Sequence, residues 1–220
     1  MRPLEGPVVE PAAGGPATSL VIFLHGVGAD GHDLIGLAPM LRRYLPDTAF
    51  LSPHAPEPCD MAPMGRQWFS LMDRRHDALL QGVQRAAPDV AALLDAERDK
   101  RGLAADRCAL FGFSQGTMTA LHVAPRYQPA LAGVVGCSGA LIGAELLGDE
   151  LRTKPPLLLM HGDLDEVVPV QALPAAREAF EGLDFSVQWE IRRGLGHGID
   201  PEGIDRAGRF LAACFEAAPG

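Results

Sequence analysis

The sequence is poor in basic residues, and it has no long apolar run. It contains 19 lysines and arginines against 28 aspartates and glutamates, so its 220 residues carry a formal net charge of −9. Because Lys and Arg supply most of the attraction to nucleic-acid phosphates, we expect no nucleic-acid partner. No apolar run approaches the length of a membrane span, and we therefore expect no integral membrane segment.

Cysteine is also scarce, with four residues and no C-x-x-C pair. Widely scattered cysteines of this kind indicate reduced core thiols rather than a disulfide set or a zinc site. The first twenty residues hold two acids and four prolines but no apolar core, which is typical of neither a signal peptide nor a transit sequence. We therefore expect a cytoplasmic protein.

Internal repeats, low-complexity tracts and charged linkers are absent too, so we expect one domain over residues 1–220. What recurs is a short apolar run, a loop with Gly or Pro, and then a longer segment of helical periodicity. The predicted strands are 19–25, 48–53, 107–113, 131–138, 156–162 and 185–191. The predicted helices are 33–45, 88–101, 115–127, 171–182 and 201–217. Pro88 fits the first turn of its helix.

This alternation of strands and helices predicts an α/β fold with a mostly parallel central sheet. Most of the strand-like runs are apolar without alternation, as in strands that are buried on both faces of a parallel sheet. Residues 1–18 are predicted to be irregular or to add an edge strand. Residues 53–77 break the pattern, and a loop of that length inside a compact domain is usually functional.

The strongest motif is G-x-S-x-G at Gly112-Phe113-Ser114-Gln115-Gly116, between a predicted strand and a predicted helix. A nucleophile on such a sharp turn needs close neighbours without a Cβ. Its oxygen then lies at the N-terminus of the following helix, where free N–H groups favour a developing oxyanion. A Gly-Ser loop that arose by chance would have the same motif. It would not explain why the motif lies between a predicted strand and a predicted helix.

A serine hydroxyl becomes a good nucleophile only when a base takes its proton and an acid orients that base. Downstream of Ser114, three acids follow a buried strand: Asp163, Asp165 and Glu166. His197 is the only histidine after them, and it is therefore the candidate base. The residues alone leave the acid open, because Asp163 could cap a turn and Glu166 could be a surface charge. No set such as H-E-x-x-H is visible, so we expect no metal and no cofactor.

The stretch HGVGADG (25–31) follows the first predicted strand and has the spacing G-x-G-x-x-G, which also fits a dinucleotide-binding loop. A dinucleotide-binding site requires an acidic residue at the end of the second strand. Here the first acidic residue after that strand is Glu57, which lies in a Pro-rich loop. An acyl-transfer site instead needs a second oxyanion donor from a Gly-rich loop after an earlier strand. The sequence favours this interpretation, with the backbone N–H groups of Val27 and Gln115 as donors.

Taken together, these motifs resemble the carboxylesterase/phospholipase family of α/β-hydrolases, which includes the acyl-protein thioesterases. The resemblance covers nearly the whole chain, through VIFLHGVGADGHDL, GFSQG, HGDLDEVVP and GHGID. It implies an α/β-hydrolase fold without a large cap domain, a homodimer, and a triad of Ser114, Asp165 and His197. Asp165 is favoured over Asp163 because the family's acid lies in the D-x-x-V-P part of its motif.

The resemblance also implies an acyl pocket, because a W-F or W-Y pair lines it in this family and Trp68-Phe69 match that pair. Four apolar side chains nearby would add an adaptable wall: Met61, Met64, Leu71 and Met72. The alternative is that these side chains fill the core beneath the loop. The family often has a second glycine after the G-x-S-x-G turn, where this sequence has Thr117, which would narrow the space behind the nucleophile.

The sequence therefore predicts a serine esterase that hydrolyses short- to medium-chain carboxylic esters through an acyl-enzyme intermediate. The same residues would serve an acyl-protein thioesterase or a lysophospholipase. An alternative of another class is a non-catalytic ligand-binding protein that kept the α/β-hydrolase fold. The expected partner is a small-molecule ester.

Overall fold

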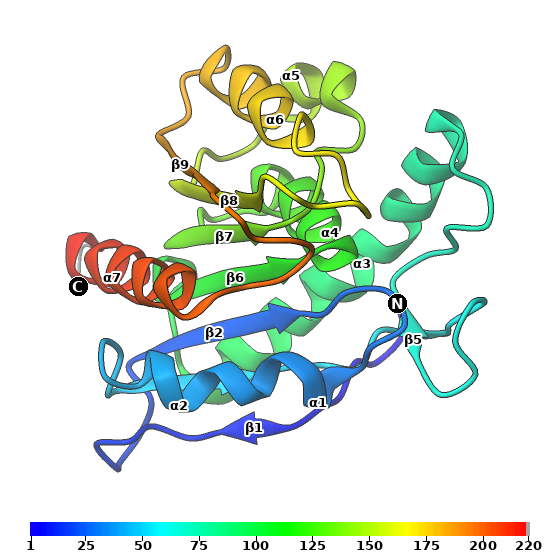
Figure 1. The fold of residues 1–220 in the computed structure, drawn as a ribbon. Coiled ribbons are helices and arrows are strands. Elements are labelled where there is room, and N and C mark those ends of the chain that lie inside the picture. Colours follow the sequence, from blue (N-terminus) through cyan, green and yellow to red (C-terminus); the bar gives the residue numbers. More distant parts are fainter. Residues whose placement is uncertain (219–220) are drawn as a thin grey trace.

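Seven strands form one twisted sheet in the computed structural model, which describes residues 1–218 (Figure 1). They are β1 (Val8–Val9), β2 (Ser19–Leu24), β3 (Thr48–Leu51), β6 (Cys108–Phe113), β7 (Gly133–Cys137), β8 (Leu157–Gly162) and β9 (Val187–Arg192). Their order is β1-β3-β2-β6-β7-β8-β9. Only the edge strand β1 is antiparallel to its neighbour, and all the other pairs are parallel, as in an α/β-hydrolase.

The helices connect these strands. They are α1 (Gly31–Leu34), α2 (Ala38–Leu41), α3 (His76–Arg101), α4 (Gln115–Val123), α5 (Leu147–Glu150), α6 (Ala172–Glu181) and α7 (Pro201–Ala217). Within residues 1–218, four 3-10 turns accompany them: Ile35–Leu37, Ala105–Arg107, Ala124–Arg126 and Ala144–Leu146. The described residues contain no large cap domain. Residues 53–77 include a small antiparallel hairpin of β4 (Glu57–Pro58) and β5 (Arg66–Gln67).

Alternate residues of each central strand enter two separate apolar layers, because successive side chains of a strand point to opposite faces. In β2, Leu20, Ile22 and Leu24 join the layer that α3, α4 and α6 cover. Val21 and Phe23 join the layer beneath α1, α2 and α7. Figure 1 shows α2 and α7 in front of the sheet and α3 and α4 behind it. Both faces are thus covered, which explains the unbroken apolar runs in the sequence.

Two predicted helices differ from those observed. The helix predicted at 88–101 begins at His76, so Pro88 lies in its interior and not in its first turn. The helix predicted at 33–45 is instead two short helices joined by a 3-10 turn at Ile35–Leu37. Gly36 and Pro39 lie in this broken region, and both residues favour interruption of a helix.

All four cysteines are free thiols, and burial raises the pKa of Cys108 to about 12. Of the helices in residues 1–218, none combines the length and the apolar character needed to cross a bilayer. The same residues contain no cluster of three or more His, Cys, Asp and Glu side chains arranged to hold a metal ion.

The parallel strands all end at one edge of the sheet, on the right of Figure 1. The loops after β2, β6, β8 and β9 therefore leave the sheet at the same edge. These four loops carry every catalytic residue that the sequence predicts.

Candidate active site

Ser114 lies on the sharp turn between β6 and α4. Its backbone has φ 54° and ψ −116°, which non-glycine residues rarely adopt and which costs about 1–3 kcal/mol. The two glycines of the motif make the turn sterically feasible. A Cβ on Gly112 would lie 2.5 Å from the Thr117 nitrogen, and one on Gly116 would lie 1.7 Å from the Leu24 carbonyl oxygen. The turn therefore requires glycine at both positions.

His197 and Asp165 form a hydrogen-bonded pair between the loops after β9 and β8. The distance from His197 Nδ1 to Asp165 Oδ2 is 2.7 Å, and the Asp165 carboxylate is shielded from solvent. Its other oxygen, Oδ1, accepts the backbone N–H groups of Val167 and Val168, both at 2.9 Å. Burial alone would raise the pKa of Asp165, but the bonds from His197, Val168 and Val167 outweigh it and lower this pKa below its ordinary value. The carboxylate is therefore ionised at neutral pH.

The imidazole of His197 lies beside the serine turn. Its ring centroid is 4.9 Å from that of Phe113, the residue before Ser114. Of the hydrogen bonds within residues 1–218, none joins the Ser114 hydroxyl to His197. Nδ1 donates to Asp165, so Nε2 is the nitrogen left to accept a proton. A catalytic serine–histidine bond often tightens only when substrate binds.

The other two candidate acids have different surroundings. Asp163 Oδ1 accepts the Gly194 N–H at 2.7 Å, and so Asp163 fixes the turn at the start of the loop that carries His197. Glu166 is exposed to solvent. Of the three acids, only Asp165 contacts His197.

The loop after β2 lies against the serine turn, since a Cβ built on Gly26 would be 3.3 Å from the Ser114 Cβ. Within residues 1–218, the backbone N–H groups of Val27 and Gln115 donate to no protein acceptor. Gln115 is the first residue of α4, where helical N–H groups lack an intrahelical partner. Two unpaired donors thus lie on the segments next to Ser114, as an oxyanion site requires.

Trp68 and Phe69 lie in the core, with 0% and 1% of their surfaces exposed. The Phe69 ring packs against Gly82 of α3, and the Trp68 indole N–H donates to the His25 carbonyl at 2.9 Å. The acyl-pocket role that the family resemblance implies for this pair therefore stays a prediction. The core-filling alternative agrees with the burial. The neighbouring methionines are at the surface, where Met64 is 92% exposed.

The sequence does not predict the roles of two side chains at the site, those of Gln115 and His161. The buried Gln115 side chain accepts the Trp68 N–H at 2.9 Å and donates to the Phe69 carbonyl at 2.6 Å, which ties the 53–77 loop to α4. His161 Nε2 lies 3.2 Å from Asp165 Oδ2 and 2.9 Å from the Val168 carbonyl. The only available signal was its position, four residues before Asp165 at the end of a strand.

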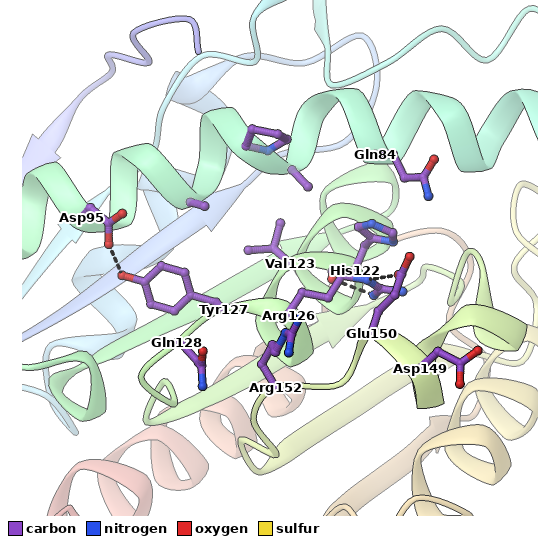
Figure 2. Close-up of a pocket in the computed structure, with 13 residues that line it drawn as sticks. Gln84, Asp95, His122, Val123, Arg126, Tyr127, Gln128, Asp149, Glu150 and Arg152 are labelled. Atoms are coloured by element: carbon purple, nitrogen blue, oxygen red, sulfur yellow. Dashed lines mark hydrogen bonds and ion pairs between the residues drawn. The ribbon is translucent and has the colours of Figure 1, made fainter.

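A pocket of about 530 Å³ lies elsewhere, between α3 and the segment that follows α4 (Figure 2). His122, Arg126, Tyr127 and Glu150 are among its lining residues, and no member of the proposed triad is. Arg126 is paired there with Glu150 at 2.6 Å. This pocket is therefore separate from the site around Ser114.

Nearly the whole chain is similar to known proteins. The family model described as Phospholipase/Carboxylesterase matches residues 4–215. The solved structure of esterase PE8 is 39% identical, covers 97% of this chain and 100% of its own, and superposes with a TM-score of 0.92. Zea mays acyl-protein thioesterase 2 is 29% identical over 94% and 97% of the two chains, with a TM-score of 0.78. Acyl-protein thioesterase 1 of Gibberella zeae is 29% identical over 93% of this chain and 94% of its own.

Proposed function

This chain belongs to the phospholipase/carboxylesterase family of serine hydrolases, and from that premise we propose that it hydrolyses carboxylic esters through Ser114, His197 and Asp165. The observation that carries the assignment is the 2.7 Å pair between His197 and Asp165, at the sheet edge where Ser114 occupies a strained turn. A buried carboxylate on Nδ1 holds the imidazole in the tautomer that leaves Nε2 free as a base.

In the proposed reaction, Ser114 Oγ attacks the ester carbonyl carbon while His197 Nε2 takes the hydroxyl proton. The negative charge on the carbonyl oxygen is stabilised by the N–H groups of Val27 and Gln115. His197 then gives its proton to the departing alcohol, and Ser114 remains acylated. A water molecule, deprotonated by the same His197, releases the acid and restores the hydroxyl. Asp165 stabilises the positive imidazole in both halves without taking its proton.

The acyl group is proposed to be short to medium in length. The burial of the Trp68-Phe69 pair in the core supports this, because these side chains leave little open space for a long acyl chain. A second candidate function is thioester hydrolysis, because two of the similar proteins are named acyl-protein thioesterases. Lysophospholipid hydrolysis would use the same residues.

The test is hydrolysis of p-nitrophenyl esters with acyl lengths from C2 to C12, with wild type beside Ser114→Ala. We expect activity that peaks at the shorter chains and falls by about 10³-fold or more in the variant. Circular dichroism shows whether the variant is folded. Near-normal activity of folded Ser114→Ala would reject the mechanism, and an inert wild type would favour the non-catalytic binding protein.

Matched oxygen-ester and thioester substrates with the same acyl group rank the two activities. Faster turnover of the thioester would make thioesterase the better description.

The expected homodimer and the cytoplasmic location also remain part of this proposal. Light scattering of the purified chain gives its mass in solution, for comparison with 23.4 kDa for one copy.

A further inference from the structure

Thr117, three residues after Ser114, has only 2% of its surface exposed. Its hydroxyl forms hydrogen bonds with both the backbone N–H and the backbone carbonyl of one residue, Cys137. Thr117 Oγ1 donates to the Cys137 carbonyl at 2.8 Å and accepts the Cys137 N–H at 2.9 Å. Cys137 is the last residue of β7, the strand next to β6. The hydroxyl therefore joins α4 to the end of a neighbouring strand.

The same Cys137 carbonyl also accepts the backbone N–H of Ser114 at 2.9 Å. Cys137 is paired in register with Phe113, and this is the final pair of the β6–β7 ladder. The Cys137 carbonyl at the end of β7 thus accepts hydrogen bonds both from the backbone N–H of the proposed nucleophile and from the Thr117 hydroxyl.

The strand end is shaped to receive this threonine. A Cβ on Gly136 would lie 2.8 Å from Thr117 Cγ2, and a Cβ on Gly139 would lie 2.4 Å from Thr117 Cβ. The Thr117 side chain therefore occupies space that both glycines leave free. The family resemblance predicts that Thr117 narrows the space behind the nucleophile. In addition, the Thr117 hydroxyl makes two hydrogen bonds there.

We propose that Thr117 is a positioning residue for catalysis, whose hydroxyl fixes the backbone on both sides of the Cys137 Cα and thereby keeps Ser114 in its attacking conformation. A strained backbone such as that of Ser114 persists only where its surroundings over-determine it. Without the hydroxyl, the Cys137 carbonyl that accepts the Ser114 N–H loses its bond from Thr117, and the Cys137 N–H loses its bond to Thr117 as well, so the backbone that holds Ser114 is less fixed. The inference rests on the proposed role of Ser114 as nucleophile.

The experiment compares Thr117→Val, which keeps the shape but removes the hydroxyl, with Thr117→Ser, which keeps the hydroxyl. The main readout is the second-order rate constant for labelling of Ser114 by a fluorophosphonate, because a rate constant does not depend on how much protein is folded. We expect Thr117→Val to lower this constant and kcat about tenfold or more, with KM changed less than about twofold. Thr117→Ser should stay within about threefold of wild type for both.

Thr153→Val is the matched control for a purely structural effect. Thr153 Oγ1 also makes two hydrogen bonds, to the Ala124 and Tyr127 carbonyls, but no residue of the proposed site is involved. Its removal should lower the melting temperature and leave the labelling rate as in wild type. Thr117→Ala, which puts no apolar methyl against Cys137, serves if Thr117→Val does not fold.

Four outcomes decide the inference. Slow labelling of the valine or alanine variant with rescue by serine supports it. Wild-type labelling of a folded Thr117→Val or Thr117→Ala overturns it and leaves Thr117 with a packing role only. Slow labelling of Thr117→Ser also overturns it, since the methyl group would then be the feature that matters. If wild type itself is not labelled at Ser114, the proposed function fails, and the inference falls with it.

Discussion

Asp163 and Asp165 lie two residues apart in the loop after β8, and their carboxylates have different partners. Asp165 faces the imidazole of His197 and two backbone N–H groups. Asp163 faces the turn that begins the His197 loop. At this scale, what separates a proposed catalytic acid from a structural one is the direction in which the side chain points.

The same substitution at the two positions should therefore have unequal effects. Asp165→Asn removes the charge that stabilises the imidazolium and favours the wrong imidazole tautomer, so kcat should fall by about 10³- to 10⁴-fold. Asp163→Asn keeps an oxygen that can accept the Gly194 N–H, so kcat should stay within about threefold of wild type. Steady-state kinetics on a p-nitrophenyl ester measures both. Equal losses in the two variants would argue against Asp165 as the acid.

At the scale of elements, the β4–β5 hairpin holds the loop that carries Val27. The Gly28 N–H donates to the Arg66 carbonyl at 2.9 Å, and the Arg66 N–H donates to the Ala29 carbonyl at 2.7 Å. The Arg66 guanidinium in turn donates to the Ala55 and Pro56 carbonyls. The segment that breaks the strand–helix alternation thus supports a proposed oxyanion donor.

Gly65→Ala should disturb this support, because a Cβ there would lie 2.2 Å from the Gly28 carbonyl oxygen. We expect kcat to fall about tenfold to a hundredfold as the Val27 N–H moves, with little change in KM. Gly36→Ala is the matched control, since its Cβ would meet no atom within 4 Å, and it should leave kcat unchanged. Wild-type kcat in a folded Gly65→Ala variant would show that the hairpin does not position the donor.

The elements also show what the sequence can and cannot predict. Five of the six predicted strands, β2, β3, β6, β7 and β8, are apolar runs because they are buried on both faces of the sheet, whereas the edge strand β9 is only partly buried. The local pattern does not predict the extension of α3 to His76, because Pro88 favours a helix start and tertiary context overrides that preference here. The Ser114, Asp165 and His197 motifs were recognisable because their chemistry restricts the residue types. The burial of Trp68-Phe69 depends on how a long loop packs, which local patterns do not encode.

At the scale of the whole molecule, buried neutral histidines make stability depend on pH. Burial, together with the charge of Arg126, lowers the pKa of His122 to about 4. An unfolded histidine titrates near pH 6.5, so between these values only the unfolded chain binds the proton. Its binding favours unfolding, and the stability present above about pH 6.5 is lost progressively as the pH falls toward 4.

Wild type should therefore lose more stability on acidification than His122→Gln, which cannot bind that proton. Between pH 7.5 and pH 5 we expect wild type to lose roughly 2 kcal/mol more in unfolding free energy than the variant loses. Urea unfolding at the two pH values measures the difference. Identical losses in the two proteins would mean that His122 does not contribute to the pH dependence.

The contact between Gly116 and the Leu24 carbonyl has a consequence for how this protein could acquire new substrates. There α4 and β2 touch through main chain alone, so no rotamer change can alter the spacing of the segments that carry Val27 and Gln115. Variation should therefore concentrate at exposed positions such as Met61, Met64 and Leu164, where side chains can change without moving these backbones. Laboratory evolution toward bulkier esters should accumulate changes at these exposed positions and retain glycine at position 116.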